Sequence, residues 1–398
     1  MKSIGVFWSE YSQQDKGKLK ECPLQDGKKL PVRVENKEDK FELQVNLWNC
    51  RVKDLQSTLL FPFLAIDFGV ICPIKTKQLA FLLPFKVEKD KFVDLADILF
   101  HHSELLCSIF NENLGISKRF NDNYYCIDGD RKLLMYELSV DNIIEMNYDD
   151  ANNATLIRFS INSDFLEDNS ERRLFLRFRF SLDNLDCFAI KKRISNDWLQ
   201  SAFSSTYLFD IRINDARELS KKKIELLEMH NYHFPKFKKV HFLYMADATE
   251  SIESDNSVSK DSRLLEKDRW TPYLGENLQF TSENIAHHWK LKESKSIGIA
   301  RSILHDGKLD VKYVPITKPF SSFTLFYKTI FSELETNRIA LYSIIVILLG
   351  ILSSAIVTIV SYAIADSNIS PIVLAIVCLF LLSAIVLYLY FSYKELKA

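Results

Sequence analysis

The sequence predicts a mainly β cytoplasmic domain, sandwich or barrel-like with a few helices, followed by a C-terminal α-helical transmembrane hairpin. Short runs rich in Phe, Tyr, Ile and Val recur between residues 41 and 245, which is typical of strands in a sandwich or barrel. Two uncharged apolar runs follow, at residues 339–365 and 369–393. At 1.5 Å per residue, each run is longer than the roughly 30 Å hydrocarbon core of a bilayer.

The first 246 residues are expected to form one β-rich sensor domain. Two segments, residues 92–113 and 214–228, carry apolar residues near helical spacing and predict helices that interrupt the strands. The strands themselves are expected at residues 41–48, 59–74, 78–85, 133–140, 143–148, 154–161, 172–180, 206–213 and 239–245.

Composition changes after this domain. Residues 247–268 are rich in Ser, Asp, Glu, Asn and Lys, which predicts a flexible acidic and polar linker. Residues 269–318 have weak patterning and stay an unassigned connecting segment. In residues 319–337, aromatic and aliphatic side chains recur every three or four positions, which predicts an amphipathic aromatic helix at the membrane interface. The alternative is an ordinary packed helix.

The hairpin is expected over residues 338–393, with a cytoplasmic tail at 394–398. The turn between the two runs carries Asp366 and no basic residue, whereas Arg338 and Lys394 flank the other ends. The positive-inside rule therefore predicts a multi-pass protein of the inner (cell) membrane with both termini in the cytoplasm. The 7 Cys form no Cys-x-x-Cys pair, as expected for reduced thiols in the cytosol.

Overall charge and motifs exclude several classes of protein. The 51 Lys+Arg and 52 Asp+Glu give a net charge of −1, so a strongly basic nucleic-acid coat is excluded. The 10 Gly are too widely spaced for a dinucleotide fingerprint or a Walker loop. No catalytic motif occurs, and we expect no enzyme, catalytic residue or cofactor. We also expect no metal site, because lysines surround the nearest pattern, His230, His233 and His241.

The clearest charge pattern lies in residues 172–180, where arginines alternate with Leu and Phe along a predicted strand. Arginine side chains on a rigid strand can fork onto phosphates. We expect this region to bind a nucleotide or a short oligonucleotide, and the alternative is an ordinary solvated charged face. The predicted ligand-binding residues are Arg173, Arg177, Arg179, Lys191, Lys192 and Arg193.

The first apolar run carries a stripe of residues at steps of three and four, several of them Gly or Ser. Small residues let helices approach closely, so the stripe is expected to line a pore or pack against another helix. Simple helix packing is the alternative. The seam residues are Ser343, Ile347, Gly350, Ser354, Val357 and Ser361.

This layout, a large domain without enzyme signatures followed by residues 339–365, a turn at 366–370 and residues 369–393, resembles that of the bacterial two-span membrane effectors of anti-phage defence, such as the membrane effector of the Hailong system. The resemblance implies a homo-oligomeric pore or ion channel in the lipid bilayer, gated by a nucleotide or oligonucleotide from a partner nucleotidyltransferase. Such an effector causes membrane depolarisation or growth arrest. The alternative function is a membrane-tethered cytoplasmic binding or scaffold protein without a pore.

Overall fold

The computed structural model describes residues 3–10, 40–121, 123–129, 131–151, 153–161, 172–192, 204–254, 259–275, 277–305, 308–318 and 320–332, together with helical positions between 343 and 362. The chain divides into two compact units. Unit 1 comprises Met1–Lys192 and Thr206–Phe331, and unit 2 comprises Arg193–Ser205 and Ser332–Ala398.

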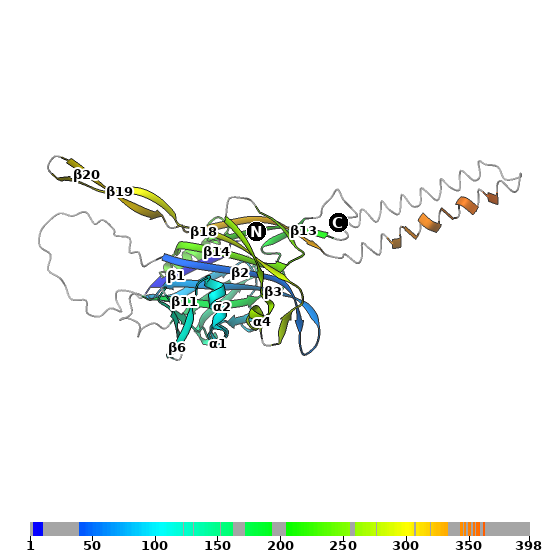
Figure 1. Ribbon diagram of the computed structural model, residues 1–398, viewed down its shortest axis with the longest axis horizontal. Coiled ribbons are helices and arrows are strands. Elements are labelled where there is room, and N and C mark those ends of the chain that lie inside the picture. Colours follow the sequence, from blue (N-terminus) through cyan, green and yellow to red (C-terminus); the bar gives the residue numbers. More distant parts are fainter. Residues whose placement is uncertain are drawn as a thin grey trace. The chain divides into compact units, whose positions relative to one another are not determined.

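A large twisted sheet forms the centre of unit 1 (Figure 1). Its strand order is β16-β18-β14-β2-β3-β11-β8-β7-β6, with β17 paired to β2 and β5 to β11. The strands are β2 (Lys40–Asp54), β3 (Leu60–Pro73), β5 (Phe92–Asp94), β6 (Gly115–Asn121), β7 (Tyr124–Asp128), β8 (Leu133–Tyr136), β11 (Arg173–Ser181), β14 (Lys236–Asp247), β16 (Ser259–Leu265), β17 (Leu278–Phe280) and β18 (Asn284–Lys292).

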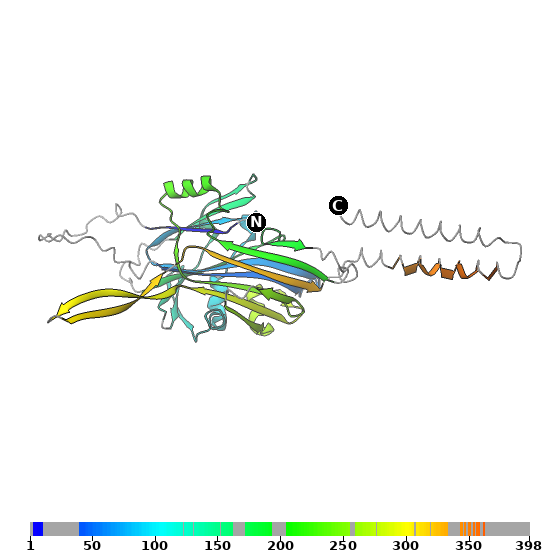
Figure 2. The ribbon, with the colours of Figure 1, turned by 90° about the horizontal axis from the view of Figure 1, so that it is seen from above.

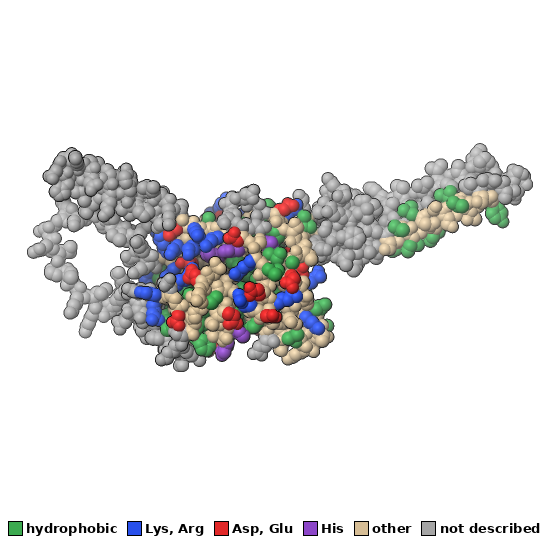
Figure 3. All heavy atoms as spheres, in the orientation of Figure 1, with side chains coloured by type: hydrophobic (Ala, Val, Ile, Leu, Met, Phe, Trp, Pro, Cys, Tyr) green, Lys and Arg blue, Asp and Glu red, His purple; other side chains and the backbone are tan. Residues whose placement is uncertain are grey.

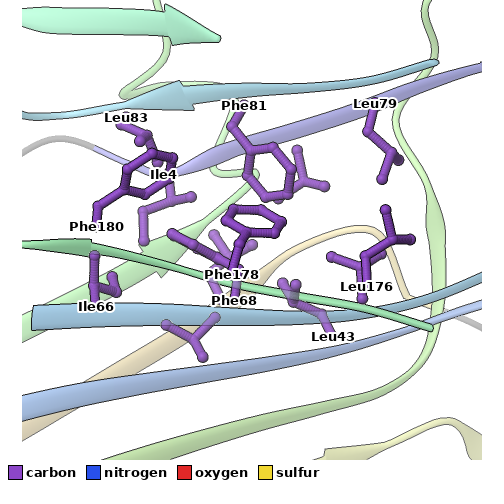
Figure 4. Packing of buried hydrophobic residues seen from close by; sticks show 14 of the residues in the cluster. Ile4, Leu43, Ile66, Phe68, Leu79, Phe81, Leu83, Leu176, Phe178 and Phe180 are labelled. Carbon is purple, nitrogen blue, oxygen red and sulfur yellow. The ribbon is translucent and has the colours of Figure 1, made fainter. Parts of the chain in front are cut away.

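Two smaller sheets cover one side of the large sheet. One has the order β1-β4-β10-β9 and the other the order β12-β13-β21-β15. Figure 4 shows the core at the first of these contacts, where Phe81 lies 5.1 Å from Phe68 and 5.3 Å from Phe178 between ring centroids. The strands are β1 (Gly5–Glu10), β4 (Thr76–Leu83), β9 (Ile143–Asp149), β10 (Ala154–Ser160), β12 (Ala189–Lys192), β13 (Ser204–Ile213), β15 (Ser251–Ser254) and β21 (Phe323–Ser332).

Helices cover part of the other side of the large sheet. The helices α1 (Ala96–His101), α2 (Ser103–Phe110) and α4 (Lys267–Leu274) contribute Leu99, Leu106 and Trp270 to a second core. We call this side of the sheet the helix side. Helix α3 (Lys221–Met229) packs elsewhere, through Leu227 in a small cluster with β1 and β4.

Strand β2 explains why both sides of the large sheet are buried along much of their length. Its odd-numbered residues, such as Leu43 and Val45, belong to the core beneath the small sheets, whereas Trp48 and Val52 belong to the core beneath the helices. Successive side chains of a strand point to opposite faces. The even-numbered residues nearer the start of β2 are polar, so the helix side changes from polar to apolar along this one strand.

The remaining strands form a two-stranded ribbon. Strand β19 (Ser294–His305) follows β18 directly, and β20 (Lys308–Lys318) pairs with β19 in antiparallel register. Figure 2 shows this ribbon extending away from the body of unit 1. Because β18 belongs to the large sheet and β21 to a small one, the ribbon joins strands of two different sheets.

The mainly β architecture confirms that part of the predicted fold class, but several predicted segments were wrong. Residues 247–268 include strands β15 and β16 and are no linker, and β18 pairs with β14 along its whole length, so no domain boundary falls at 246. Polar composition misled here because β16 is an edge strand whose Asp261 and Ser262 face solvent. The predicted helix at 92–113 is split into β5, α1 and α2.

The predicted aromatic helix at 319–337 was also wrong, because Phe323–Ser332 is strand β21. Phe323, Leu325 and Tyr327 are buried, whereas Phe326 is 50% exposed. This alternation is the period of two that a strand requires. The aromatic residues of this segment fit the helical steps of three and four residues as well as the strand period of two. Packing of Phe323, Leu325 and Tyr327 against the core selects the strand.

The predicted transmembrane hairpin, with its membrane location, channel and pore, is likewise corrected. Within the residues that the structure describes, no helix is long and apolar enough to cross a membrane. The second run at 369–393 and the tail at 394–398 lie outside the described residues.

The seam residues of unit 2 adopt helical conformation, as predicted for the first run. Ile347 and Val357 are 60% and 62% exposed. A Cβ built on Gly350 would meet no atom within 4 Å, and the Ser361 hydroxyl donates to the Val357 carbonyl at 2.8 Å. Close helix packing at this stripe therefore stays a prediction.

Candidate functional site

Strand β11 carries the arginines that the sequence analysis singled out, and two of them lie in the interior. Arg177 and Arg179 are 0% and 3% exposed, and both lie on the helix side of the large sheet. Asp67 of β3 lies directly opposite Arg179 in the register of the two strands and is fully buried. A buried charge is stable only when it is paired and hydrogen-bonded, so the partners of these side chains decide their role.

Asp67 is the centre of what we call the interior cluster, which comprises Gln44, Trp48, Asp67, Arg177, Arg179 and Tyr273. Its carboxylate accepts hydrogen bonds from Arg179 Nε at 2.7 Å, from Trp48 Nε1 at 2.7 Å and from the Tyr273 hydroxyl at 2.9 Å. Although burial lowers the pKa of Arg179, the adjacent Asp67 outweighs that effect and raises it.

Arg177 of β11, two residues before Arg179, completes the interior cluster. Its Nε donates to the Tyr273 hydroxyl at 2.7 Å, and its Nη1 donates to Gln44 Oε1 at 2.8 Å. The second contact crosses over Gly69 of β3, where a Cβ would lie 2.8 Å from Arg177 Nη1. Only glycine leaves room for this bridge across the strand. Arg177 and Arg179 are therefore engaged inside the protein and present no surface to a phosphate.

A second polar assembly lies on the same side of the sheet, beyond the helices. At its centre is Glu42 of β2, whose side chain is 6% exposed. Arg173 Nη1 lies 3.0 Å from Glu42 Oε1, and Arg131 Nη1 lies 3.4 Å from Oε2. The ammonium groups of Lys238 and Lys239 lie 3.9 and 3.8 Å from the same carboxylate. One carboxylate thus holds four cations from β11, β14 and the turn between β7 and β8.

The cations around Glu42 outnumber the acids. Glu112 pairs with Arg131 at 2.7 Å, and Glu293 pairs with Lys40 at 2.7 Å. Lysines of β14 and β18 extend the positive surface, and Figure 3 shows Lys, Arg and His side chains gathered over these strands. We call this surface the basic face, and it comprises Lys40, Arg131, Arg173, Lys238, Lys239, Lys290 and Lys292 with the acids Glu42, Glu112 and Glu293.

Like charges crowd one another on the basic face. Burial lowers the pKa of Lys290, and the nearby Lys292 and Lys239 lower it further. Burial also lowers the pKa of Lys239, and although Glu42 opposes this effect, Arg131 and Lys238 add to it. Burial raises the pKa of Glu42 itself, but the effect of Arg173, Lys239 and Arg131 is larger and lowers it. The surface therefore holds a surplus of positive charge, which an anion would relieve.

Two histidines lie within the basic face. His241 of β14 is opposite Lys290 of β18 in the sheet register, and His241 Nδ1 lies 2.8 Å from His288 Nε2. Their ring planes are nearly parallel, with centroids 5.1 Å apart and an interplanar angle of 13°. Burial lowers the pKa of His241 to about 3 and that of His288 to about 4, with Lys290 adding to both effects. Both imidazoles are thus neutral at pH 7.

The structure separates the residues that the sequence analysis grouped as one ligand site. Of these, Arg173 lies in the basic face, with a side chain 24% exposed. Lys191 and Lys192 belong to β12 of a smaller sheet, where the Lys191 ammonium lies 5.6 Å from the centre of the Tyr207 ring. Arg193 lies outside the described residues.

Sequence reasoning missed Glu42, Arg131, Lys290 and the histidine pair. A usable signal was present in β14 and β18, where Lys239 and His241, and then His288, Lys290 and Lys292, alternate with apolar residues. Such alternation places one polar row on one face of a strand. Strand pairing across distant segments, which one sequence does not show, was needed to join these rows.

In the described part of the chain, no group of three or more His, Cys, Asp or Glu side chains is placed to hold a metal ion. The basic face offers cations and neutral imidazoles and so can bind an anion. No protein family and no curated protein matches the chain, so the geometry alone carries the functional argument.

Proposed function

We propose that the chain is a ligand-binding protein whose basic face takes a phosphate-rich ligand, a nucleotide or a short oligonucleotide. The observation that carries the proposal is the surplus of cations around Glu42, with seven Lys and Arg side chains against three acids as defined above. Phosphate oxygens accept hydrogen bonds from Arg and Lys, and these charge-assisted bonds are stronger than neutral ones.

The organisation of the cations supports a built site over a random charged surface. Arg173 and Arg131 are fixed by Glu42, and Arg173 Nη1 is held at 3.0 Å from it. Side chains that are already ordered lose less conformational entropy when a ligand binds. Burial and the neighbouring Lys292 lower the pKa of Lys290. Lys290 pairs with Ser259 of the edge strand β16, so Lys290 and Lys292 extend the surface toward the edge of the sheet. The first pair would orient phosphate, and the second would attract it.

The other expectations from the sequence remain predictions. Anti-phage defence, a partner nucleotidyltransferase, homo-oligomerisation and the absence of enzymatic activity have no support from relatives, because none matches. Gating of a pore forms no part of the proposal, since no described helix spans a membrane.

The test is binding of a 5′-labelled single-stranded DNA decamer, and of ATP, by the double variant Lys290→Gln with Lys292→Gln. We expect weaker binding of both probes by the variant than by the wild type. For single strands the slope of log K against log salt is about −0.7 per phosphate contact, so the decamer slope should become shallower by about 1.4. Fluorescence anisotropy at several salt concentrations measures the decamer, and calorimetry measures ATP.

The matched control is Lys86→Gln with Lys328→Gln, which removes two lysines elsewhere in unit 1. Both side chains are exposed, and each pairs with a glutamate. The control should bind both probes like the wild type, with an unchanged salt slope. Equal losses in the two double variants would show diffuse attraction by net charge, and wild-type protein that binds neither probe would refute the proposal.

A further inference from the structure

The ribbon of β19 and β20 begins and ends beside the basic face. Strand β19 starts two residues after Lys292 of that surface, and the intervening Glu293 donates its backbone N–H to the Lys238 carbonyl at 2.9 Å. Two residues beyond the end of β20, Phe320 forms an antiparallel bridge to Phe237 of β14, with hydrogen bonds of 2.7 and 3.2 Å. Both strands of the ribbon are therefore anchored at the lysine-rich end of β14.

The pairing register sorts the residues of the ribbon into two faces. Residues paired across an antiparallel ribbon share a face, and alternate residues of one strand belong to opposite faces. Strand β20 places Lys308, Lys312 and Lys318 at even-numbered positions together with one acid, Asp310. Arg301 of β19 is paired with Lys312 and so belongs to the same face. We call this face, with its four Lys and Arg positions, the cationic face of the ribbon.

The opposite face of the ribbon is mainly apolar. There Ile299 is paired with Tyr313, and Leu304 is paired with Leu309. Of the Lys and Arg residues of β19 and β20, only Lys295 belongs to this face. A surface that serves only solubility carries both signs of charge interspersed. The segregation of the cations to one face instead favours a role in binding an extended anion.

The length of the ribbon decides which anion could use this face. Strand β19 has 12 residues, which at about 3.3 Å per residue extend about 40 Å. Figure 2 shows the ribbon extending away from the body of unit 1. Arg301 lies roughly 23 Å along the ribbon from the start of β19. A single nucleotide bound at Lys290 and Lys292 cannot reach that position, whereas an oligonucleotide carries a negative charge at every phosphate along its length.

We infer that the ribbon is a second binding element for the ligand of the basic face, and that this ligand is an oligonucleotide whose backbone continues along the cationic face of the ribbon. The inference rests on the proposed function and narrows the ligand from nucleotides in general to chains of several nucleotides. Contacts from Arg and Lys to phosphates position a backbone without reading its sequence. Binding should therefore depend on the length of the chain and on salt.

The test measures fluorescence anisotropy of two single-stranded oligothymidylates, of three and of twenty nucleotides, at several salt concentrations. Arg301→Gln with Lys312→Gln removes two paired positions from the cationic face. For single strands each phosphate contact contributes about 0.7 to the slope of log K against log salt. The slope for the longer probe should therefore become shallower by about 1.4, whereas binding of the trimer should stay unchanged.

Two further variants separate local contacts from overall charge. Arg301→Lys with Lys312→Arg keeps both charges and should keep the wild-type slope for the longer probe. Lys86→Gln with Lys328→Gln removes the same charge elsewhere in unit 1 and should bind both probes like the wild type. The trimer also reports on folding, because a loss of folded protein weakens both probes equally.

An unchanged slope for the longer probe in Arg301→Gln with Lys312→Gln would overturn the inference, and continued binding of the trimer would leave the proposed function standing. Equal losses for the two probes, or equal losses in the Lys86 and Lys328 variant, would overturn the inference as well, because the ribbon would then make no contact of its own. Failure of the wild type to bind either probe would overturn the proposed function and the inference together.

Discussion

The interior cluster and the basic face lie on the same side of the large sheet and use the same kinds of residue. In the interior cluster, α4 supplies Tyr273, which together with Asp67 and Gln44 accepts the hydrogen bonds of two arginines. In the basic face, the lysines of β14 and β18 are half-buried or exposed, and the acids are outnumbered. The types of residue on these strands therefore do not predict whether they form a buried cluster or an exposed basic surface.

The difference between these regions lies in what closes over the strands. A charge that is enclosed must find its partners within the protein, and it then stabilises the fold only through them. A charge at an open surface keeps its attraction for a ligand at little cost to stability. We expect substitutions in the interior cluster to change the free energy of unfolding and substitutions in the basic face to change affinity.

The largest effect is expected for Asp67→Asn. This substitution removes the charge that faces Arg179 and places an amide donor among the donors from Trp48 and Tyr273. Breaking a buried ion pair from one side costs about 3–5 kcal/mol, and chemical denaturation measures the loss. As a control, Asp183→Asn removes an acid that is 72% exposed and pairs with Lys91, for which we expect less than about 1 kcal/mol.

A smaller effect is expected for Gly69→Ala, which sharpens the comparison without changing any charge. The new Cβ would lie 2.8 Å from Arg177 Nη1 and 3.0 Å from Gln44 Oε1, so the bridge between these side chains must shift. Overpacking of this kind costs about 1–3 kcal/mol.

Gly115→Ala is the matched control for the substitution at Gly69. It places a Cβ on strand β6, with the nearest atom at 4.0 Å, and should change the free energy of unfolding by less than about 0.5 kcal/mol. Equal unfolding midpoints for the two glycine variants would contradict the role given to the gap at Gly69.

The effect of Asp94→Asn depends on pH, and its sign is opposite to that of Asp67→Asn. Asp94 is half-buried, and burial raises its pKa to about 8. Its folded-state pKa exceeds the unfolded value of about 3.9, so the folded state holds the extra proton, and stability falls as the pH rises from 4 to 8. Asparagine removes this dependence.

Denaturation of Asp94→Asn at two pH values measures the effect. We expect Asp94→Asn to be more stable than the wild type at pH 8 and to show no gain at pH 4. A loss of stability at both values would show that Asp94 is held as a charged group after all.

Much of the fold was predictable from local pattern, and the site was predictable only in part. The alternating residues of β11 predicted a strand with arginines on one face, and that placement is correct for Arg173, Arg177 and Arg179. Whether the face is open or closed depends on α4, which lies far along the chain in a segment left unassigned.

Pairing between distant strands explains what the sequence left out. Glu42 meets Lys239 because β2 and β14 are neighbours, and His241 meets His288 because β14 and β18 pair. The apolar run at 339–365 led to a wrong prediction for another reason, because hydropathy alone was taken as evidence for a bilayer. Strand β21 was predicted wrongly because its aromatic residues fit both the helical and the strand period, and only their burial distinguishes the two.

The position of β2 also bears on how the protein is made. Its pairing with β3 is local, but its parallel pairing with β14 joins Lys40 to Lys236 and waits until most of unit 1 has left the ribosome. Such non-local pairing slows folding, because the chain loses entropy before the contact is gained. The edge of β2 is exposed meanwhile, and an unpaired edge invites other strands. We therefore expect nascent chains that end before β14 to depend on chaperones.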